Sequence, residues 1–167
     1  LRQLVSTPGG FSAGSGRHRF KFDGFPEIAP LICYEIIFPG AMGTERPGLA
    51  VNVTNDAWYG RTPGPWQHLR FAQIRAVEQG LPLLRAANNG MSVAIDSYGR
   101  ITEGLNLNEI ATIDTYLPAK LQPTQFFLRG QLTFSLILFA LAAIAGLTIL
   151  RARSRMSCMA SPSAMRR

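Results

Sequence analysis

The chain has 167 residues, enough for one domain and an appendage, which excludes a protein of several domains. It has 17 basic and 10 acidic residues, but five arginines lie in the last 17 residues, where no acidic residue occurs. The first 150 residues carry 12 basic against 10 acidic residues, a balance that gives no indication of nucleic-acid binding. A hydrophobic content of 47% excludes a disordered chain, and two cysteines exclude a disulfide-stapled scaffold.

The first part of the chain predicts a loop followed by two strands. Residues 6–16 are rich in Gly, Ser and Pro, which indicates a mobile loop. The apolar runs Pro30–Tyr34 and Leu49–Thr54 are typical of strands, and the turn-favouring pair Asn55–Asp56 follows the second. We therefore expect two buried strands here.

A helix is predicted from Pro65 to Gln79. Pro65 suits the first turn of a helix, and Gly80 suits its C-terminal cap. At about 100° per residue, five apolar residues are expected to share the face that packs on the rest of the domain. They are Trp66, Leu69, Ala72, Ala76 and Val77.

Three further strands are predicted after this helix. Leu81–Ala87 and Met91–Asp96 flank Asn88–Gly90, whose residue types suit the positive backbone angles of a tight hairpin turn. Glu109–Tyr116 is expected to be the last strand. Strands interleaved with a helix predict an α/β domain, although four or five strands amount to half of a larger sheet.

The segment from Gly130 to Leu150 predicts a transmembrane helix. It has 21 residues without a charge, bounded by Arg129 and Arg151, and a helix of this length is roughly 30 Å long, enough to cross a bilayer. A buried core helix is the alternative. Because basic flanks stay in the cytoplasm, the tail from Arg151 is expected inside and the domain before Arg129 outside.

The beginning of the chain conflicts with this orientation. The chain starts at Leu1 and has no charged and then apolar leader that could export the domain. A single C-terminal span would leave the preceding domain in the cytoplasm. We therefore expect the chain to be the C-terminal part of a larger membrane protein.

Cys33 is the candidate nucleophile. It is the only cysteine in the domain expected outside the cytoplasm, and it lies where a strand-like run ends. The alternative is a small buried hydrophobic residue. A reactive thiolate needs a neighbouring base or cation and an oxyanion donor, and Glu35 is the nearest titratable group other than Tyr34. The two histidines and the two lysines of the chain are expected at the surface: His18, His68, Lys21 and Lys120.

Other motifs lack the context that their chemistry requires. Gly10–Gly14 spells G-x-S-x-G, but no strand precedes it, so it is not expected to present a serine nucleophile. Gly14–Gly16 lacks the residues of a phosphate loop. No pair of cysteines or histidines has the spacing of a metal site, and no cofactor is expected.

Five blocks in series resemble the apolipoprotein N-acyltransferases, the membrane-embedded branch of the nitrilase superfamily. The resemblance covers about residues 1–118, and the apolar segment after them fits as well. The blocks are Leu31–Glu35 (LICYE), Val53–Gly60 (VTNDAWYG), Gly64–His68 (GPWQH), Arg75–Glu78 (RAVE) and Arg85–Gly90 (RAANNG).

The resemblance implies a bacterial inner-membrane enzyme whose nitrilase-like αββα domain lies on the periplasmic side. It would move an acyl chain from a phospholipid to the N-terminal, lipid-modified cysteine of an apolipoprotein. Cys33 would be the nucleophile that forms a thioester, Tyr34 and Glu35 its supporting neighbours, and Trp58 a substrate-binding residue near the site. The implied divisions are a partial nitrilase-like domain (1–118), a linker (119–129), the transmembrane helix (130–150) and a basic cytoplasmic tail (151–167).

The sequence also departs from the family. The family's general-base Glu and catalytic Lys lie upstream of the cysteine in motifs that are not present here, and neither Lys21 nor Glu27 has the matching context. Without a general base, acyl transfer should slow by a factor of about 10² to 10⁴, and half of a sheet leaves an unpaired edge, so we expect this chain alone to be inactive and poorly folded. Two alternatives remain: a membrane-anchored nitrilase-like amidase, and a non-catalytic, membrane-tethered remnant.

Overall fold

The computed structural model describes residues 14–130 and 132–159, with side chains up to residue 152. It divides into two compact units, Leu1–Thr124 and Gln125–Arg167. Most of the Gly/Ser/Pro stretch lies outside the described residues, as does the serine of the Gly10–Gly14 motif. Each unit is described separately below.

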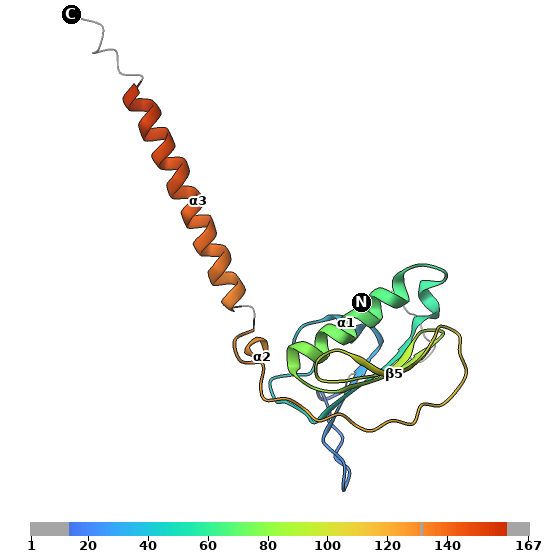
Figure 1. Cartoon of the computed structure of the whole chain (residues 1–167). Helices are drawn as coiled ribbons and strands as arrows, with labels where there is room; N and C mark the ends of the chain where they lie inside the picture. The colour runs from blue at the N-terminus through green and yellow to red at the C-terminus, as the bar shows by residue number, and fades with distance from the viewer. Residues whose placement is uncertain (1–13, 131, 160–167) are drawn as a thin grey trace, which may run out of the picture. The chain divides into compact units, whose positions relative to one another are not determined.

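The first unit is built on one mixed five-stranded sheet with the strands in chain order (Figure 1). The first three strands are parallel, and the last two are antiparallel to their neighbours. The sequence predicted four of these strands to within two residues at either end. The strands are β1 (Ile28–Ile32), β2 (Leu49–Asn55), β3 (Leu83–Asn88), β4 (Ser92–Ile95) and β5 (Ile101–Leu105).

The prediction of a last strand at Glu109–Tyr116 was wrong. Residues 106–124 form no strand or helix, and the side chains of Ile110 and Tyr116 are almost fully exposed. The edge beside β4 is taken by β5, because a tight turn stabilised by Asp96 brings Ile101 directly back to Ile95. Alternating apolar residues form a strand only where a neighbouring strand offers them backbone partners.

The helix α1 (Gly64–Gln79) packs on one face of this sheet (Figure 1). It has a proline in its first turn, as predicted, and ends at Gly80, whose left-handed conformation (φ 62°, ψ 39°) suits a residue without a side chain. Together the helix and the sheet bury one apolar cluster. Its members include Leu31, Ile36, Ala50, Leu69, Ala72, Ala76, Leu83, Val93 and Ile95.

The predicted inner face of α1 was right in part. Leu69, Ala72 and Ala76 are buried, whereas Trp66 and Val77 are about half exposed. The buried stripe is centred on Ala72, and at 100° per residue Trp66 and Val77 lie about 120° and about 140° round the helix from it. Polar residues occupy the inner positions that remain: His68, Arg75 and Gln79.

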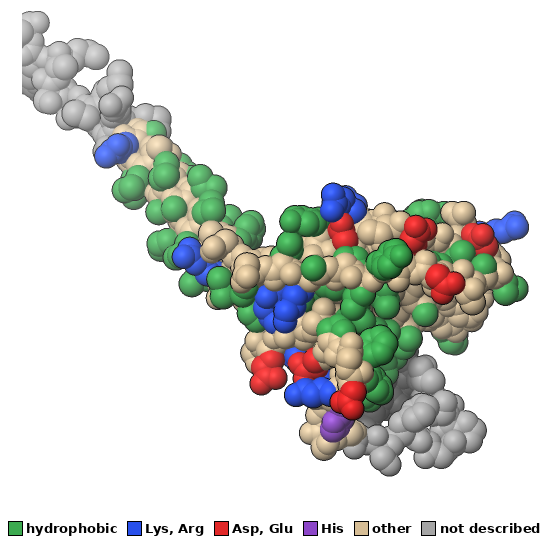
Figure 2. Space-filling model, turned by 60° about the horizontal axis from the view of Figure 1, so that its bottom comes forward, with side chains coloured by type: hydrophobic (Ala, Val, Ile, Leu, Met, Phe, Trp, Pro, Cys, Tyr) green, Lys and Arg blue, Asp and Glu red, His purple; other side chains and the backbone are tan. Residues whose placement is uncertain are grey.

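The second unit consists of two helices, α2 (Gln125–Arg129) and α3 (Leu132–Met159). In α3 the segment Leu132–Ala152 has a mean hydropathy of 2.4 and is long and apolar enough to cross a membrane. The most apolar stretch of 18 residues in this segment has no residue buried against the rest of the described structure. Hydrophobic side chains cover the helix in the face shown in Figure 2. The predicted apolar C-terminal helix is therefore confirmed.

Candidate active site

Cys33 lies at a sharp elbow in the backbone. It follows the last residue of β1 and begins the 3-10 helix η1 (Cys33–Ile37), at the strand-to-turn junction where the sequence placed it. Its φ of 50° is in the left-handed region, which is rare for a residue other than glycine. Because such strain persists only where the surroundings enforce it, the elbow is a candidate functional site.

The Glu35 side chain closes this elbow. Its Oε2 accepts a hydrogen bond of 2.8 Å from the backbone N–H of Ile32, the residue before the cysteine. A carboxylate that accepts from a backbone N–H is a strong, charge-assisted partner. Glu35 therefore braces the turn that presents the Cys33 side chain, which is half-buried.

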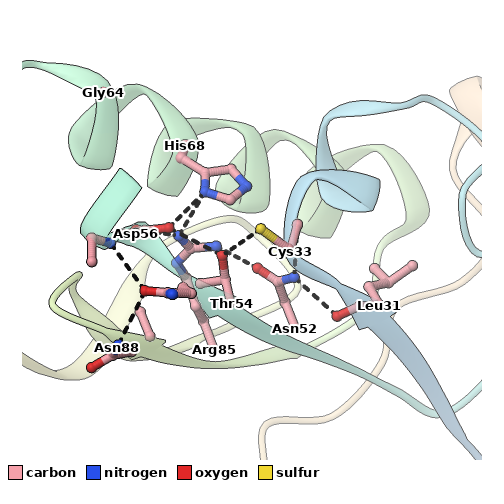
Figure 3. A network of polar contacts seen from close by, with 12 residues as sticks. Leu31, Cys33, Asn52, Thr54, Asp56, Gly64, His68, Arg85 and Asn88 are labelled. Carbon is pink, nitrogen blue, oxygen red and sulfur yellow. Dashed lines mark hydrogen bonds and ion pairs between the residues drawn. The ribbon is translucent and has the colours of Figure 1, made fainter. Parts of the chain in front are cut away.

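Two residues of the neighbouring strand β2 contact Cys33. Thr54 Oγ1 lies 3.3 Å from Cys33 Sγ, and Asn52 Nδ2 donates to the carbonyl oxygens of Cys33 at 3.3 Å and of Leu31 at 3.1 Å. These contacts are drawn in Figure 3. The sulfur and the backbone of the elbow are thus both anchored to the sheet.

A fully buried polar network continues from these two residues (Figure 3). Thr54 Oγ1 lies 3.1 Å from Asp56 Oδ1, which also lies 2.9 Å from His68 Nδ1. Arg85 donates from Nη2 to Asp56 Oδ2 at 2.7 Å and from Nη1 to Asn52 Oδ1. The Asp56 carboxylate thus has the Arg85 guanidinium, the His68 ring and the Thr54 hydroxyl as neighbours, while Arg85 Nε and His68 Nε2 are buried without a hydrogen-bond partner among the described residues.

The expectation that His68 lies at the surface was wrong. Its side chain is 2% exposed, because α1 turns this position toward the sheet, where Asp56 is its partner. Asn52, Thr54 and Arg85 were not among the site residues predicted from the sequence. One signal was available in the sequence, because Asn52 and Arg85 each interrupt an apolar strand. In the structure the two residues are paired across the parallel strands β2 and β3.

Aromatic side chains surround His68. The rings of Tyr34 and Tyr59 lie 5.9 Å and 5.6 Å from the imidazole, centroid to centroid. Burial raises the pKa of Tyr59, and the Asp56 carboxylate raises it further, so this phenol stays neutral. Tyr34, the residue after Cys33, is about half exposed.

Trp58 lies in the second 3-10 helix, η2 (Asp56–Tyr59), which directly follows β2. Its side chain is 86% exposed, and η2 packs against α1 and β3. A cavity of about 770 Å³ adjoins η2 and the start of α1, and its lining includes Asp56, Arg61, Trp66 and Asn89. Asp56 thus connects this cavity to the network below Cys33.

The other three cationic candidates lie at the surface, as expected. His18 is exposed beside Ser15, and Lys120 is exposed in the segment after β5. Lys21 is also exposed, and its Nζ pairs with Glu27 at 3.4 Å. Among the described residues, the groups that contact the Cys33 sulfur and backbone come instead from β2.

Residues 3–125 match the carbon-nitrogen hydrolase family, which is nearly three quarters of the chain. The chain belongs to this family. Two relatives with the name apolipoprotein N-acyltransferase are similar to it: one from Brucella melitensis is 50% identical over 157 residues, and one from Rhodopseudomonas palustris is 45% identical over 153 residues. These matches cover 93% and 90% of this chain but only 30% and 28% of the relatives.

The carbon-nitrogen hydrolase domain is also similar to solved structures. An amidase from Nesterenkonia sp. AN1 is 19% identical, with a TM-score of 0.49 over 75% of this chain and 50% of the amidase. Nit3 of Saccharomyces cerevisiae, a member of the nitrilase superfamily, is 18% identical, with a TM-score of 0.48 over 59% of this chain and 40% of Nit3. Family membership and the mixed sheet with its packed helix agree with the predicted nitrilase-like α/β fold.

Proposed function

We propose that this chain supplies the acyl-carrying cysteine and a membrane helix of an apolipoprotein N-acyltransferase. The 50% identity to proteins of that name over 93% of the chain is the observation that carries the proposal. The chain spans less than a third of the length of these relatives. The complete activity is therefore proposed for a protein of the relatives' full length.

The proposed reaction has two steps through Cys33. In the first, the thiolate attacks an acyl ester carbonyl of a phospholipid, the carbon–sulfur bond of a thioester forms, and the lysophospholipid leaves as an alcohol that takes up a proton. In the second, the amino group of the apolipoprotein's lipid-modified cysteine attacks the thioester, loses a proton as the amide forms, and frees the thiol. A covalent carrier suits two bulky lipids that need not bind together.

Local geometry supports this role for Cys33. The left-handed elbow turns the cysteine out of the strand, and the half-buried sulfur is accessible to a substrate. We assign Glu35 to bracing of the elbow, since it accepts from Ile32 N–H, and Tyr34 and the exposed Trp58 to contact with the lipid substrates. The general base and the cation for the oxyanion are assigned to the part of the longer protein that this chain does not include.

The membrane arrangement is proposed from the charge pattern. The segment Leu132–Ala152 is apolar, and the tail that follows contains five arginines, at 151, 153, 155, 166 and 167, and no acidic residue. Because basic flanks stay in the cytoplasm, we assign the tail to the cytoplasm and the hydrolase-like domain to the periplasmic side of a bacterial inner membrane.

The two native cysteines test this arrangement. In intact cells a membrane-impermeant maleimide is expected to label Cys33 directly and Cys158 only after permeabilisation. A Cys33→Ala variant assigns the signal. Labelling of Cys158 in intact cells would reverse the proposed orientation.

A chimera tests the chemistry. This chain replaces the matching 157 residues of the Brucella melitensis relative, and the chimera is purified in detergent with phospholipid. Peptide mass spectrometry is expected to find an acyl adduct on Cys33 that hydroxylamine removes and that is absent in Cys33→Ala. A chimera that forms amide product without Cys33, or forms no adduct while the intact relative does, would refute the proposal.

The acceptor distinguishes the amidase alternative. With a diacylglyceryl lipopeptide the acyl-loaded chimera is expected to give N-acylated peptide, whereas a hydrolase would release only free fatty acid. The 167-residue chain alone, in the same micelles, is expected to give neither product, because the base is supplied from elsewhere. Acyl transfer by the chain alone would contradict that assignment.

A further inference from the structure

The Thr54 hydroxyl stands between two groups that compete for its single hydrogen. Its Oγ1 lies 3.3 Å from Cys33 Sγ and 3.1 Å from Asp56 Oδ1 (Figure 3). A hydroxyl has one hydrogen to donate and two lone pairs with which to accept. It can therefore donate to the carboxylate or to the sulfur, but not to both at once.

Asp56 does not depend on this hydroxyl. Its Oδ2 accepts from Arg85 Nη2 at 2.7 Å, and its Oδ1 lies 2.9 Å from His68 Nδ1. Arg85 Nη2 also lies 3.1 Å from His68 Nδ1, and because an ionised carboxylate only accepts, the His68 tautomer that bonds Asp56 carries its hydrogen on Nδ1. Because both carboxylate oxygens keep a partner, rotation of the Thr54 hydroxyl away from Asp56 leaves no buried acceptor unpaired.

The Cys33 sulfur, by contrast, changes its capacity to donate and accept hydrogen bonds during the reaction. A neutral thiol can donate its hydrogen to Thr54 Oγ1 while the hydroxyl donates to Asp56. A thiolate can only accept, and a hydrogen bond to a charged acceptor is about twice as strong as a neutral one. A thioester sulfur carries no charge and is a weak acceptor.

We propose that Thr54 is a positioning residue that switches its hydroxyl from Asp56 to the Cys33 thiolate and back as the sulfur is charged and then acylated. The inference rests on the proposed role of Cys33 and deepens it. The thiol proton leaves to the base or to solvent and not to Thr54, so no proton is stored on the hydroxyl. The hydrogen bond from Thr54 therefore stabilises the attacking thiolate more than it stabilises the thioester.

The backbone of the elbow stays fixed during this rotation. Asn52 Nδ2 holds the carbonyl of Cys33, and Asn52 Oδ1 is in turn held by Arg85. The same arginine therefore fixes both the carboxylate that Thr54 leaves and the amide that anchors the cysteine. Only the hydroxyl hydrogen has to move.

The charged and titratable groups of the elbow and of the network beside it come from four elements. They are Tyr34 and Glu35 on η1, Asp56 and Tyr59 on η2, His68 on α1 and Arg85 on β3. A substitution at Thr54 that alters none of these charges isolates the hydroxyl. Thr54→Val keeps the branched shape and removes the hydroxyl, Thr54→Ser keeps the hydroxyl, and Thr102→Val is the matched control on β5, where the hydroxyl bonds Ala94 O.

The experiment measures alkylation of Cys33 by iodoacetamide in the chimera. Rates are followed by peptide mass spectrometry from about pH 6 to about pH 10, which brackets the usual thiol range. At neutral pH Thr54→Val is expected to react about tenfold more slowly, with the midpoint of its pH profile raised by about one unit and its plateau at high pH unchanged. Thr54→Ser and Thr102→Val are expected to react like the unaltered chimera.

A merely structural role of Thr54 would lower the rate at every pH and reduce the midpoint of thermal unfolding. Such a result, or a Thr54→Val profile within twofold of the unaltered one, overturns the inference. The acyl adduct separates the two proposals. If Thr54→Val shifts the alkylation profile while the unaltered chimera forms no adduct from phospholipid, the hydroxyl switch stands and the acyltransferase assignment falls.

Discussion

Arg85 and Asp56 form an ion pair of 2.7 Å, Nη2 to Oδ2, in which neither side chain has any exposed surface. The arginine comes from β3 and the aspartate from the start of η2, which follows β2. Such a pair is expensive to desolvate, but once it is formed the loss of one partner leaves an uncompensated buried charge. The pair therefore ties the middle of β3 to the residue that directly follows β2.

The first prediction concerns this pair. Arg85→Met and Asp56→Asn, each made alone in the chimera, are expected to lower the free energy of unfolding of the domain by about 3–5 kcal/mol. The double variant leaves no unpaired charge, so its loss should be smaller than the sum of the two. Urea unfolding followed by tryptophan fluorescence measures all three. Strictly additive losses would show that the two residues do not act as a pair.

A second prediction separates two roles of Glu35. If Glu35 acts by accepting a hydrogen bond from Ile32 N–H, the side-chain amide oxygen of a glutamine can replace it. The Glu35→Gln variant should then form the acyl adduct on Cys33 at a rate within about threefold of the unaltered chimera. Glu35→Ala leaves the elbow unbraced and should slow acylation by about tenfold or more. The initial rate of adduct formation from phospholipid is the measurement. Equal losses in both variants would assign a role to the negative charge itself.

Gly90 provides the third prediction. A side chain here would meet Asp56, since an added Cβ would lie 2.8 Å from Asp56 Cγ and 2.9 Å from Ala87 Cβ. Gly90→Ala is therefore expected to displace the carboxylate, destabilise the domain by about 1–3 kcal/mol and slow Cys33 alkylation. Gly14→Ala, whose Cβ would meet only Gly16 O at 3.9 Å, is the matched control. A Gly90→Ala variant with the control's stability would show that the network tolerates this shift.

Much of the sheet and its helix could be predicted from the sequence, because the signals there are local. Apolar runs and turn residues predicted β1 to β4, and a proline and a glycine marked the two ends of α1. The strand predicted at Glu109–Tyr116 failed because pairing with β4 depends on which segment returns first, and the short Asp96 turn brings Ile101 there. Two segments compete for pairing with β4, and the residue pattern within either segment does not show which of them pairs.

The candidate site was likewise predictable from the sequence only in part. Cys33 lies at the end of a strand-like run and Glu35 two residues further along the chain, so local signals were enough to propose both as candidates. His68, Asp56 and Arg85 come from three separate elements, and only the packing of α1 on parallel strands brings them together. An isolated histidine or arginine is typical of a surface, so the burial of His68 required knowledge of the tertiary fold.

The strained backbone of Cys33 leads to a fourth prediction. At φ 50° a side chain clashes with the backbone, and a left-handed residue other than glycine costs about 1–2 kcal/mol. Both Cys33→Gly and Cys33→Ala remove the thiol and should form no adduct. Cys33→Gly should nevertheless be the more stable of the two by about 1 kcal/mol, because glycine accepts this conformation without strain. Thermal unfolding compares them, and a more stable alanine variant would show that the elbow relaxes.

The fifth prediction is a dependence of stability on pH that Asp96 sets. Burial raises the pKa of this carboxyl, but hydrogen bonds from Arg100 and from the backbone N–H of Tyr98 lower it by more, so the pKa lies below its ordinary value. The folded state thus binds the proton more weakly than the unfolded state. The stabilisation is fully present above the ordinary aspartate range and is lost as the pH falls through the lowered pKa.

Asp96→Asn isolates this effect. The amide oxygen can still accept from the backbone N–H groups of Tyr98 and Arg100, but it has no charge for the Arg100 side chain, whose Nε lies 2.7 Å from the native carboxylate. The gap in unfolding midpoint between the native residue and the variant is expected to be largest near pH 6 and to close from about pH 4 downward. Because the other acidic residues titrate in both proteins, they cancel in the difference. A gap that persists unchanged at about pH 2.5 would mean that Asp96 stabilises the turn by geometry alone.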